Sequence, residues 1–156
     1  MSGPSLDRIR AAALAAADQA AGPAGNVRPF ALGWATVDLD RAASELARDL
    51  GFSPAAFVDR TGSEALGASC RVADGVVPGG LSLAILEPAT EGRLAATLAR
   101  FGEGPTVVWY RTDEGVPSEA STPRAGPFGP EWLVSGAPVH GPHRFLIRPG
   151  AGTIPP

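Results

Sequence analysis

The chain has 156 residues, of which 44% are hydrophobic, and a formal net charge of −3 at pH 7. That length and hydrophobic content fit one domain with a sizeable core and leave little room for a second. The charge offers no basic stripe for phosphates, and no apolar run approaches the roughly 20 residues that cross a bilayer. We therefore expect neither a nucleic-acid partner nor a membrane partner, and the chain is predicted to be cytoplasmic.

Composition also limits the chemistry. All 13 basic residues are arginine, which excludes mechanisms that need a lysine amine, such as a Schiff base or a Walker-type phosphate loop. The single cysteine, Cys70, allows no internal disulfide and is expected to be a small core residue. The two histidines, His140 and His143, could bind a metal with Glu131 as third ligand, but surface positions are expected for histidines in a Gly/Pro-rich segment.

The first predicted element is a helix from Leu6 to about Ala20, with Ser5 as its N-cap. Its apolar stripe is thin, which is typical of a helix that packs on the outside of a domain. A Gly/Pro-rich segment follows and ends the helix. Residues 1–27 are thus predicted to form an N-terminal helix and linker ahead of a single domain over residues 28–156.

That domain begins with a strand-to-helix pattern. Phe30–Val37 has the composition of a buried strand. The next predicted helix is Arg41–Leu50, for which Asp38 or Asp40 serves as N-cap and Gly51 as a left-handed stop. Capping is therefore the expected role of both aspartates, rather than chemistry.

Further elements follow at short spacing. The predicted strands are Ala55–Asp59, Ala68–Ala73 and Leu81–Leu86. Thr90 is expected to cap a helix over Glu91–Phe101 that ends at Gly102, and Thr106–Arg111 is the next strand. The order up to Leu86 is β-α-β-β-β, an arrangement of strands and helices that indicates an α+β fold.

Two stretches carry a family resemblance: Phe30-Ala-Leu-Gly-Trp-Ala-Thr-Val-Asp-Leu-Asp40, and Leu86-Glu-Pro88 with the following helix and Gly102-Glu-Gly-Pro105. Over about Phe30 to Arg111 the chain resembles the vicinal oxygen chelate superfamily of glyoxalase-like and bleomycin-resistance-like proteins. The first module is most similar to methylmalonyl-CoA epimerase-like members. The resemblance implies β-α-β-β-β modules in a curved mixed sheet flanked by helices, with a first module over 28–88 and a degenerate second module over 104–150.

The resemblance also implies where a metal would bind. The family's ligand positions fall on Ala31, Ala84 and Val107, or Thr106 if the register slips by one, and a fourth ligand has no clear match in residues 144–148. Alanine and valine cannot coordinate a metal. We therefore expect no metal and no other cofactor.

The second module departs from the family pattern. Asp113–Pro130 is rich in Pro, Gly and Ser, so a loop is predicted where the family has a helix. Strands are expected at Glu131–Ser135 and His143–Arg148, followed by an extended tail over Pro149–Pro156. A homodimer could complete such an incomplete half, because unpaired sheet edges favour association.

Strand alternation predicts which side chains line an apolar cleft. With the three implied metal positions on the concave face, the lining comprises Ala31, Gly33, Ala35, Ser82, Ala84, Leu86, Val107, Trp109 and Arg111. Trp109 would stack on a ligand and Arg111 would hold an acid or enolate. The alternative is that Trp109 fills the core, as most strand tryptophans do, and that Arg111 reaches solvent. Tyr110 points the other way and belongs to the packing residues.

The catalytic candidates are few. Arg111 could stabilise an oxyanion, and Glu87 or Glu103 could act as a base if buried, although their places at element ends favour solvated positions. The leading hypothesis is metal-independent binding of an organic small molecule in the cleft. A cofactor-free isomerase, cyclase or lyase, and a structural or partner-binding subunit, remain open alternatives.

Overall fold

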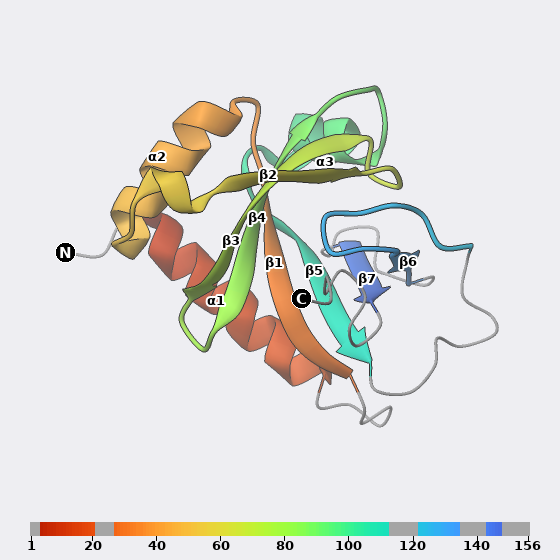
Figure 1. Ribbon diagram of the computed structural model, residues 1–156, viewed down its shortest axis with the longest axis horizontal. Coiled ribbons are helices and arrows are strands. Elements are labelled where there is room, and N and C mark those ends of the chain that lie inside the picture. Colours follow the sequence, from red (N-terminus) through yellow and green to blue (C-terminus); the bar gives the residue numbers. More distant parts are fainter. Residues whose placement is uncertain (1–3, 21–26, 113–121, 135–142, 148–156) are drawn as a thin grey trace, which may run out of the picture.

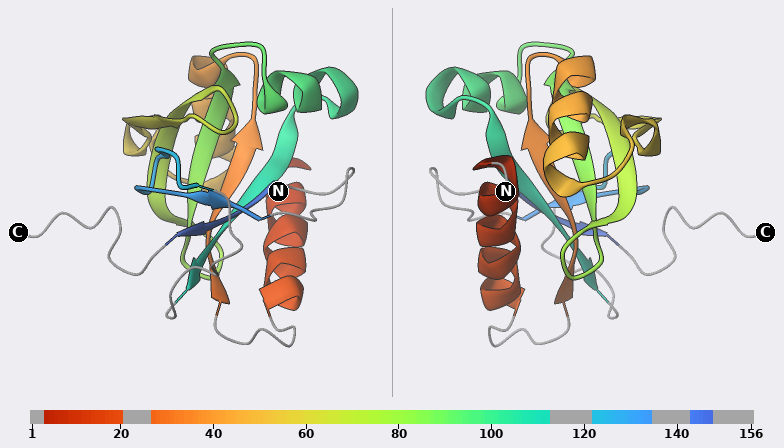
Figure 2. Two further views of the ribbon diagram at one scale, coloured as in Figure 1. Left: turned by 90° about the vertical axis from the view of Figure 1, so that its right-hand side faces the viewer. Right: turned by 90° about the vertical axis from the view of Figure 1, so that its left-hand side faces the viewer.

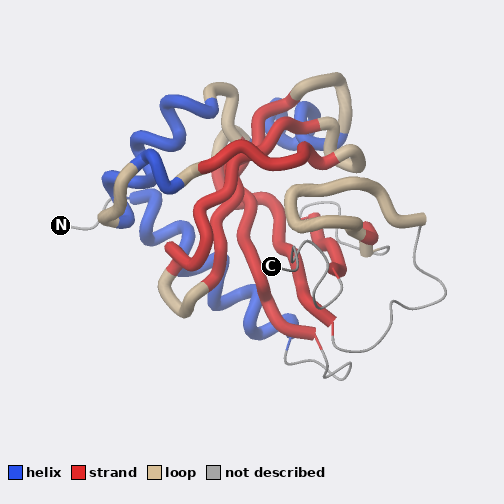
Figure 3. The backbone as a smooth tube through the Cα atoms, viewed as in Figure 1, coloured by secondary structure: helices blue, strands red, loops and turns tan. Residues whose placement is uncertain are grey.

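The computed structural model describes residues 4–20, 27–112, 122–134 and 143–147. Its elements, drawn in Figures 1 and 3, are α1 (Pro4–Ala20), β1 (Val27–Ala35), α2 (Leu39–Leu50), the 3-10 turn η1 (Pro54–Ala56), β2 (Val58–Ser63), β3 (Ala68–Val77), β4 (Leu81–Pro88), α3 (Arg93–Phe101), β5 (Gly104–Thr112), β6 (Trp132–Leu133) and β7 (His143–Ile147). Within these ranges no helix is long and apolar enough to cross a membrane.

The strands form one curved mixed sheet in the order β2-β3-β4-β1-β5-β7-β6. At its centre β1 and β5 pair antiparallel, while β1 pairs parallel with β4 and β5 pairs parallel with β7. The β1-α2-β2-β3-β4 succession confirms the predicted β-α-β-β-β module, and the sheet with its helices confirms the predicted α+β class.

An approximate two-fold axis between β1 and β5 relates the two halves of the sheet. Ala31 pairs with Trp109 and Gly33 pairs with Val107, so a rotation that exchanges β1 and β5 carries the first pair onto the second. The same rotation carries the β1–β4 pairing onto the β5–β7 pairing and the β3–β4 pairing onto β6–β7. The second half is shorter, and residues 122–130 contain no helix, as the loop prediction for this part of the chain expects.

Two apolar cores lie on opposite faces of the sheet. The outer core joins α1 and α2 to the sheet, and its largest buried members are Ile9, Leu32, Trp34, Leu46, Leu83, Ile85 and Tyr110. The inner core lies on the concave face under α3 and the 122–134 segment, and its largest buried members are Leu66, Leu86, Leu94, Trp109, Phe128, Phe145 and Ile147. Figure 2 shows α1 along one face of the sheet and the 122–134 segment across the other.

Helix α2 follows its sequence signals closely. The Asp38 side chain accepts a hydrogen bond from the Arg41 backbone N–H, and Gly51 ends the helix with a left-handed φ of 86°. Asp40 lies in the first turn and pairs with Arg71 at 2.7 Å. The predicted capping role of Asp38 is therefore confirmed, while Asp40 lies inside the helix.

Several predicted boundaries were wrong, and three of them have a clear physical reason. Helix α1 begins at Pro4, so Ser5 lies inside it rather than capping it. Residues 54–56 form a 3-10 turn, because Ser53 caps it and Pro54 favours its first position. Strand β2 therefore starts only at Val58. Thr90 does not cap α3, because the backbone of residues 89 and 90 is bound to the Gly67 carbonyl and the helix starts after Gly92.

Candidate functional site

A buried carboxylate lies over the concave face of the sheet. Glu131 pairs backbone to backbone with Arg124, which places it at the end of the 122–134 segment next to β6. Its side chain is only 1% exposed. Oε1 accepts a hydrogen bond from Trp109 Nε1 at 3.0 Å, and Oε2 accepts one from Ser63 Oγ at 2.7 Å. The group is thus fixed by donors from β5 and from the end of β2.

The surroundings of Glu131 alter its acidity. Burial raises the pKa of Glu131 to about 7, although the hydrogen bonds from Trp109 and Ser63 and the charge of Arg124 act in the opposite direction. A carboxyl group in this range exchanges its proton near neutral pH. It therefore has the acidity that general acid–base chemistry and proton-coupled binding require.

A cavity of about 280 Å³ opens beside this carboxyl group. It is lined by Glu131, Arg93, Arg124, Ala65, Thr122 and Leu133. Arg93 begins α3 and Arg124 comes from the 122–134 segment, so two exposed cations from separate segments line the same cavity as Glu131. Arg124 also lies 3.7 Å from Glu64 at the β2–β3 turn. In Figure 1 the 122–134 segment, in blue, passes close to this turn, and the Glu64 backbone N–H donates a hydrogen bond to the Ala125 carbonyl.

The expected apolar cleft is filled in this structure. Its predicted lining residues do share the concave face, but Ala31, Ala84 and Trp109 are 0% exposed and pack in the inner core. The Trp109 ring makes an edge contact with Phe128 and stacks on Phe145, with centroids 5.0 and 6.0 Å apart. Trp109 here has the packing role of the alternative interpretation, and its contact with a ligand stays a prediction.

The remaining lining residues support the same description. Leu86 and Val107 are buried, as are Ala35 and Ser82. A Cβ atom added to Gly33 would lie 2.7 Å from Val107 Cβ and 2.8 Å from Leu86 Cδ1. A side chain at residue 33 would therefore clash with its neighbours on the concave face, which favours glycine there.

Arg111 and Glu87 lie near the C-terminal ends of their strands, β5 and β4. The Arg111 guanidinium lies over the Phe30 ring, 5.8 Å from its centroid, and the residue is half-buried. Glu87 Oε1 accepts a hydrogen bond from the Leu39 backbone N–H at 3.3 Å, at the start of α2. Neither group lines the cavity beside Glu131.

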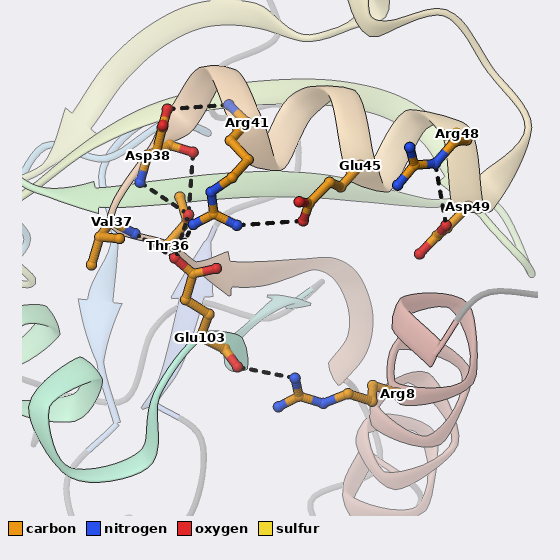
Figure 4. Close-up of polar contacts among 9 residues, drawn as sticks. All are labelled: Arg8, Thr36, Val37, Asp38, Arg41, Glu45, Arg48, Asp49 and Glu103. Carbon is orange, nitrogen blue, oxygen red and sulfur yellow. Dashed lines mark hydrogen bonds and ion pairs between the residues drawn. The ribbon is translucent and has the colours of Figure 1, made fainter.

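Glu103 joins three elements near the start of β5, as Figure 4 shows. Its Oε2 accepts hydrogen bonds from Arg41 at 2.5 Å and from Thr36 Oγ1 and the Val37 N–H at 3.0 Å. Burial acts to raise the pKa of Glu103, but these donors outweigh it and lower the pKa below its ordinary value. A carboxylate held ionised in this way is a poor base, so these contacts favour a structural role.

Of the two histidines proposed as metal ligands, His143 lies in the part of the chain that the structure describes. His143 begins β7 and its Nε2 lies 3.0 Å from Thr97 Oγ1. Burial, together with the charge of Arg93, lowers the pKa of His143, so its ring is neutral at pH 7. His140 lies outside the described residues. Among the described side chains, no group of three His, Cys, Asp or Glu residues could hold a metal.

Solved structures share this architecture. A Streptomyces coelicolor methylmalonyl-CoA epimerase variant, in complex with 2-nitronate-propionyl-CoA, is 22% identical, with a TM-score of 0.62 over 81% of this chain and 99% of its own. The chain has the vicinal oxygen chelate fold. Methylmalonyl-CoA epimerase from Mycobacterium tuberculosis is 19% identical, with a TM-score of 0.59 over 78% of this chain and 87% of its own. A hypothetical protein from Bacillus halodurans is 15% identical, with a TM-score of 0.57 over 79% and 94%.

No family model matches the chain, and no curated protein matches it. The similarity to solved structures therefore shows the fold and confirms the resemblance on which the module prediction rests. It leaves the reaction and the ligand to the residues of this chain.

The metal positions that the vicinal oxygen chelate resemblance implies do not fit a metal here. Ala31, Ala84 and Val107 are all buried in the inner core. The two-fold relation between β4 and β7 places Phe145 where β4 has Ala84, because the pairing of Ala31 with Ser82 repeats in that of Val107 with His143. Four hydrocarbon side chains thus occupy the four positions, and none is a metal ligand.

Sequence reasoning missed the importance of Glu131. It treated this residue as a weak third ligand beside two histidines, whereas the structure places it against Trp109 and Ser63. Trp109 lies 22 residues and Ser63 lies 68 residues away along the chain, so no local spacing could reveal the contact. A glutamate between two aromatic residues, in Phe128-Gly-Pro-Glu131-Trp132, was the available signal for a buried carboxylate.

Proposed function

We propose that this protein binds a small organic anion, without using a metal, in the cavity formed by Arg93, Arg124 and Glu131. The observation that carries the proposal is that two arginines and a buried, titratable glutamate line one cavity of about 280 Å³. Guanidinium groups are planar and present paired donors, which suits carboxylate and enolate oxygens. The proposed site lies on the concave side of the sheet, displaced from the implied metal positions.

The fold supports a role in binding small molecules. One structure with this fold is a methylmalonyl-CoA epimerase in complex with methylmalonyl-CoA and NH4+. Another is the epimerase variant in complex with 2-nitronate-propionyl-CoA. Both hold organic ligands, which favours a small-molecule ligand for this chain over a macromolecular one.

Isothermal titration with benzoate tests the proposed site, with benzamide as a neutral ligand of similar shape. We expect binding of benzoate and not of benzamide. Arg124→Ala and Arg93→Ala should each weaken the affinity for benzoate roughly tenfold, because each removes a charge-assisted hydrogen bond.

Arg100→Ala is the matched control, because Arg100 also lies on α3 but packs over the Phe101 ring, away from the cavity lining. Its affinity for benzoate should equal that of the wild type. Affinities of Arg93→Ala and Arg124→Ala for benzoate that equal the wild-type affinity would contradict the proposal. No binding of small acids at all would favour the third interpretation, a partner-binding subunit with a filled concave face.

A cofactor-free isomerase is the second candidate, and the raised pKa of Glu131 is the observation that favours it. A carboxylate with a pKa near 7 can remove a proton next to a carbonyl, and the nearby arginines can stabilise the enolate that forms. In D2O, the protein should then exchange the C3 hydrogens of 2-oxobutyrate, as NMR detects. Unchanged exchange in Glu131→Gln would exclude Glu131 as the base.

A further inference from the structure

We propose that the cavity takes up its organic anion together with one proton, which resides on the Glu131 carboxyl group. This inference rests on the proposed anion site and adds its ligand chemistry: a compact monoanion that accepts from Arg93 and Arg124 while Glu131 is neutral. The affinity of this site for an anion would then depend on the protonation of Glu131, unlike that of a surface depression lined by arginines alone.

An anion that enters the cavity is expected to favour the protonated form of Glu131. The Glu131 side chain is 1% exposed and lines the same cavity as the two arginines. An ionised carboxylate there repels a second negative charge, and burial weakens the screening of that repulsion. Protonation removes the repulsion and leaves the positive charge of the arginines for the ligand.

The contacts of Glu131 allow both protonation states. In the ionised state Oε2 accepts from Ser63 Oγ at 2.7 Å and Oε1 accepts from Trp109 Nε1 at 3.0 Å. The Ser63 oxygen also accepts from the Leu66 N–H, so this hydroxyl already serves both as donor and as acceptor. A proton on Oε2 can point to Ser63 Oγ while Oε1 keeps its bond to Trp109.

The charged and titratable groups around Glu131 come from its own segment and from four others. Arg124, on its own segment, lowers the pKa of Glu131, and Glu64 at the β2–β3 turn raises it. Cys70 on β3 has a pKa raised by burial to about 12, so its thiol stays neutral. Arg93 on α3 lines the cavity. The pKa of His143 on β7 is lowered by burial and by the charge of Arg93, so that its ring is neutral. Burial raises the pKa of Glu131 to about 7, which makes its carboxyl group the proton acceptor of the proposal.

Titration calorimetry with benzoate at pH 6, 7 and 8, in buffers of different ionisation enthalpy, tests the proposal. Above pH 7 we expect uptake of about one proton per bound benzoate and a loss of affinity approaching tenfold per pH unit, as linkage requires for one coupled proton. Glu131→Gln should bind benzoate with no proton uptake and with the same affinity at all three pH values.

Glu64→Gln is the matched control. Glu64 is an exposed carboxylate beside Arg124 that raises the pKa of Glu131, so its substitution should keep the proton uptake and only move the pH dependence to lower pH. Benzoate binding without proton uptake in the wild type, or unchanged pH dependence in Glu131→Gln, would overturn the inference and leave the anion site intact. No benzoate binding by the wild type at any pH would overturn the proposed function and the inference together.

Discussion

At the scale of single residues, the buried carboxyl group of Glu131 is the clearest departure from ordinary core chemistry. Most charged side chains remain in water, whereas this one is enclosed by Trp109, Ser63 and the Gly126 backbone. Each of its two oxygens accepts a hydrogen bond, so no acceptor is left unsatisfied by burial. The buried negative charge still destabilises the folded state. Stability should therefore depend on pH through this residue.

Replacing Glu131 with Gln should change that dependence. The folded-state pKa of Glu131 is raised to about 7, so the folded state binds the proton more tightly than the unfolded chain. Its contribution to stability is fully present below the unfolded pKa and is lost as pH rises through about 7. The loss should total roughly 2–3 kcal/mol by pH 8, measured as the free energy of unfolding in urea.

Glu131→Gln keeps an acceptor for Trp109 and a donor for Ser63, so it should flatten the decline and exceed the wild type in stability at pH 8. Equal declines from pH 5 to pH 8 in both proteins would show that another group is responsible.

At the scale of elements, Glu103 connects the start of β5 to the β1–α2 junction. Its carboxylate binds Arg41, Thr36 and the Val37 backbone, and its backbone carbonyl accepts from Arg8 of α1 at 3.0 Å. Glu103 thus contacts α1, the residues that follow β1 and the first turn of α2, all of which lie more than 60 residues before it in the sequence. The pairing of β1 with β5 ends beside it, at Ala35 and Gly104.

Glu103→Gln should lower the free energy of unfolding by about 1–2 kcal/mol at pH 7, because it weakens several charge-assisted hydrogen bonds at once. The pKa of Glu103 is lowered, so its contribution is present above the unfolded pKa and is lost as pH falls through the folded pKa. The difference between variant and wild type should therefore shrink in acid.

The matched control is Glu45→Gln, which also removes a carboxylate that faces Arg41, but on the exposed surface of α2. That change should cost less than about 0.5 kcal/mol. Equal losses for the two variants would show that the extra bonds of Glu103 contribute nothing to stability.

At the scale of the whole molecule, α1 is built into the outer core. Ile9 is 0% exposed and Ala16 is 2% exposed against the sheet, and the Ala16 carbonyl accepts a hydrogen bond from the Tyr110 hydroxyl at 3.3 Å. Burial raises the pKa of Tyr110, in keeping with its predicted packing role. The division of the chain into an N-terminal helix with linker and a separate domain stays a prediction, as does the homodimer.

Ile9→Ala should lower the free energy of unfolding by about 2–4 kcal/mol, because it leaves a cavity between α1 and the sheet. Leu14→Ala provides the comparison within the same helix, since Leu14 is 70% exposed, and should change stability by less than about 0.5 kcal/mol. Urea unfolding followed by circular dichroism and by tryptophan fluorescence should give one transition. A small effect of Ile9→Ala would show that α1 stabilises the sheet little.

The features that could be predicted from the sequence are those that depend on neighbouring residues. The α2 helix with its Asp38 cap and Gly51 stop, the β-α-β-β-β order, and the buried positions of Cys70 and Tyr110 all follow from local patterns, because capping and strand alternation act over a few residues. The packing of Phe128 and Phe145 on the concave face could not be predicted in this way. The same holds for the hydrogen bonds from Ser63 and Trp109 that hold Glu131 at a cavity lined by two arginines. These contacts join distant segments across the sheet, and burial, which sets the pKa of Glu131, is a property of the packed molecule and not of any stretch of sequence.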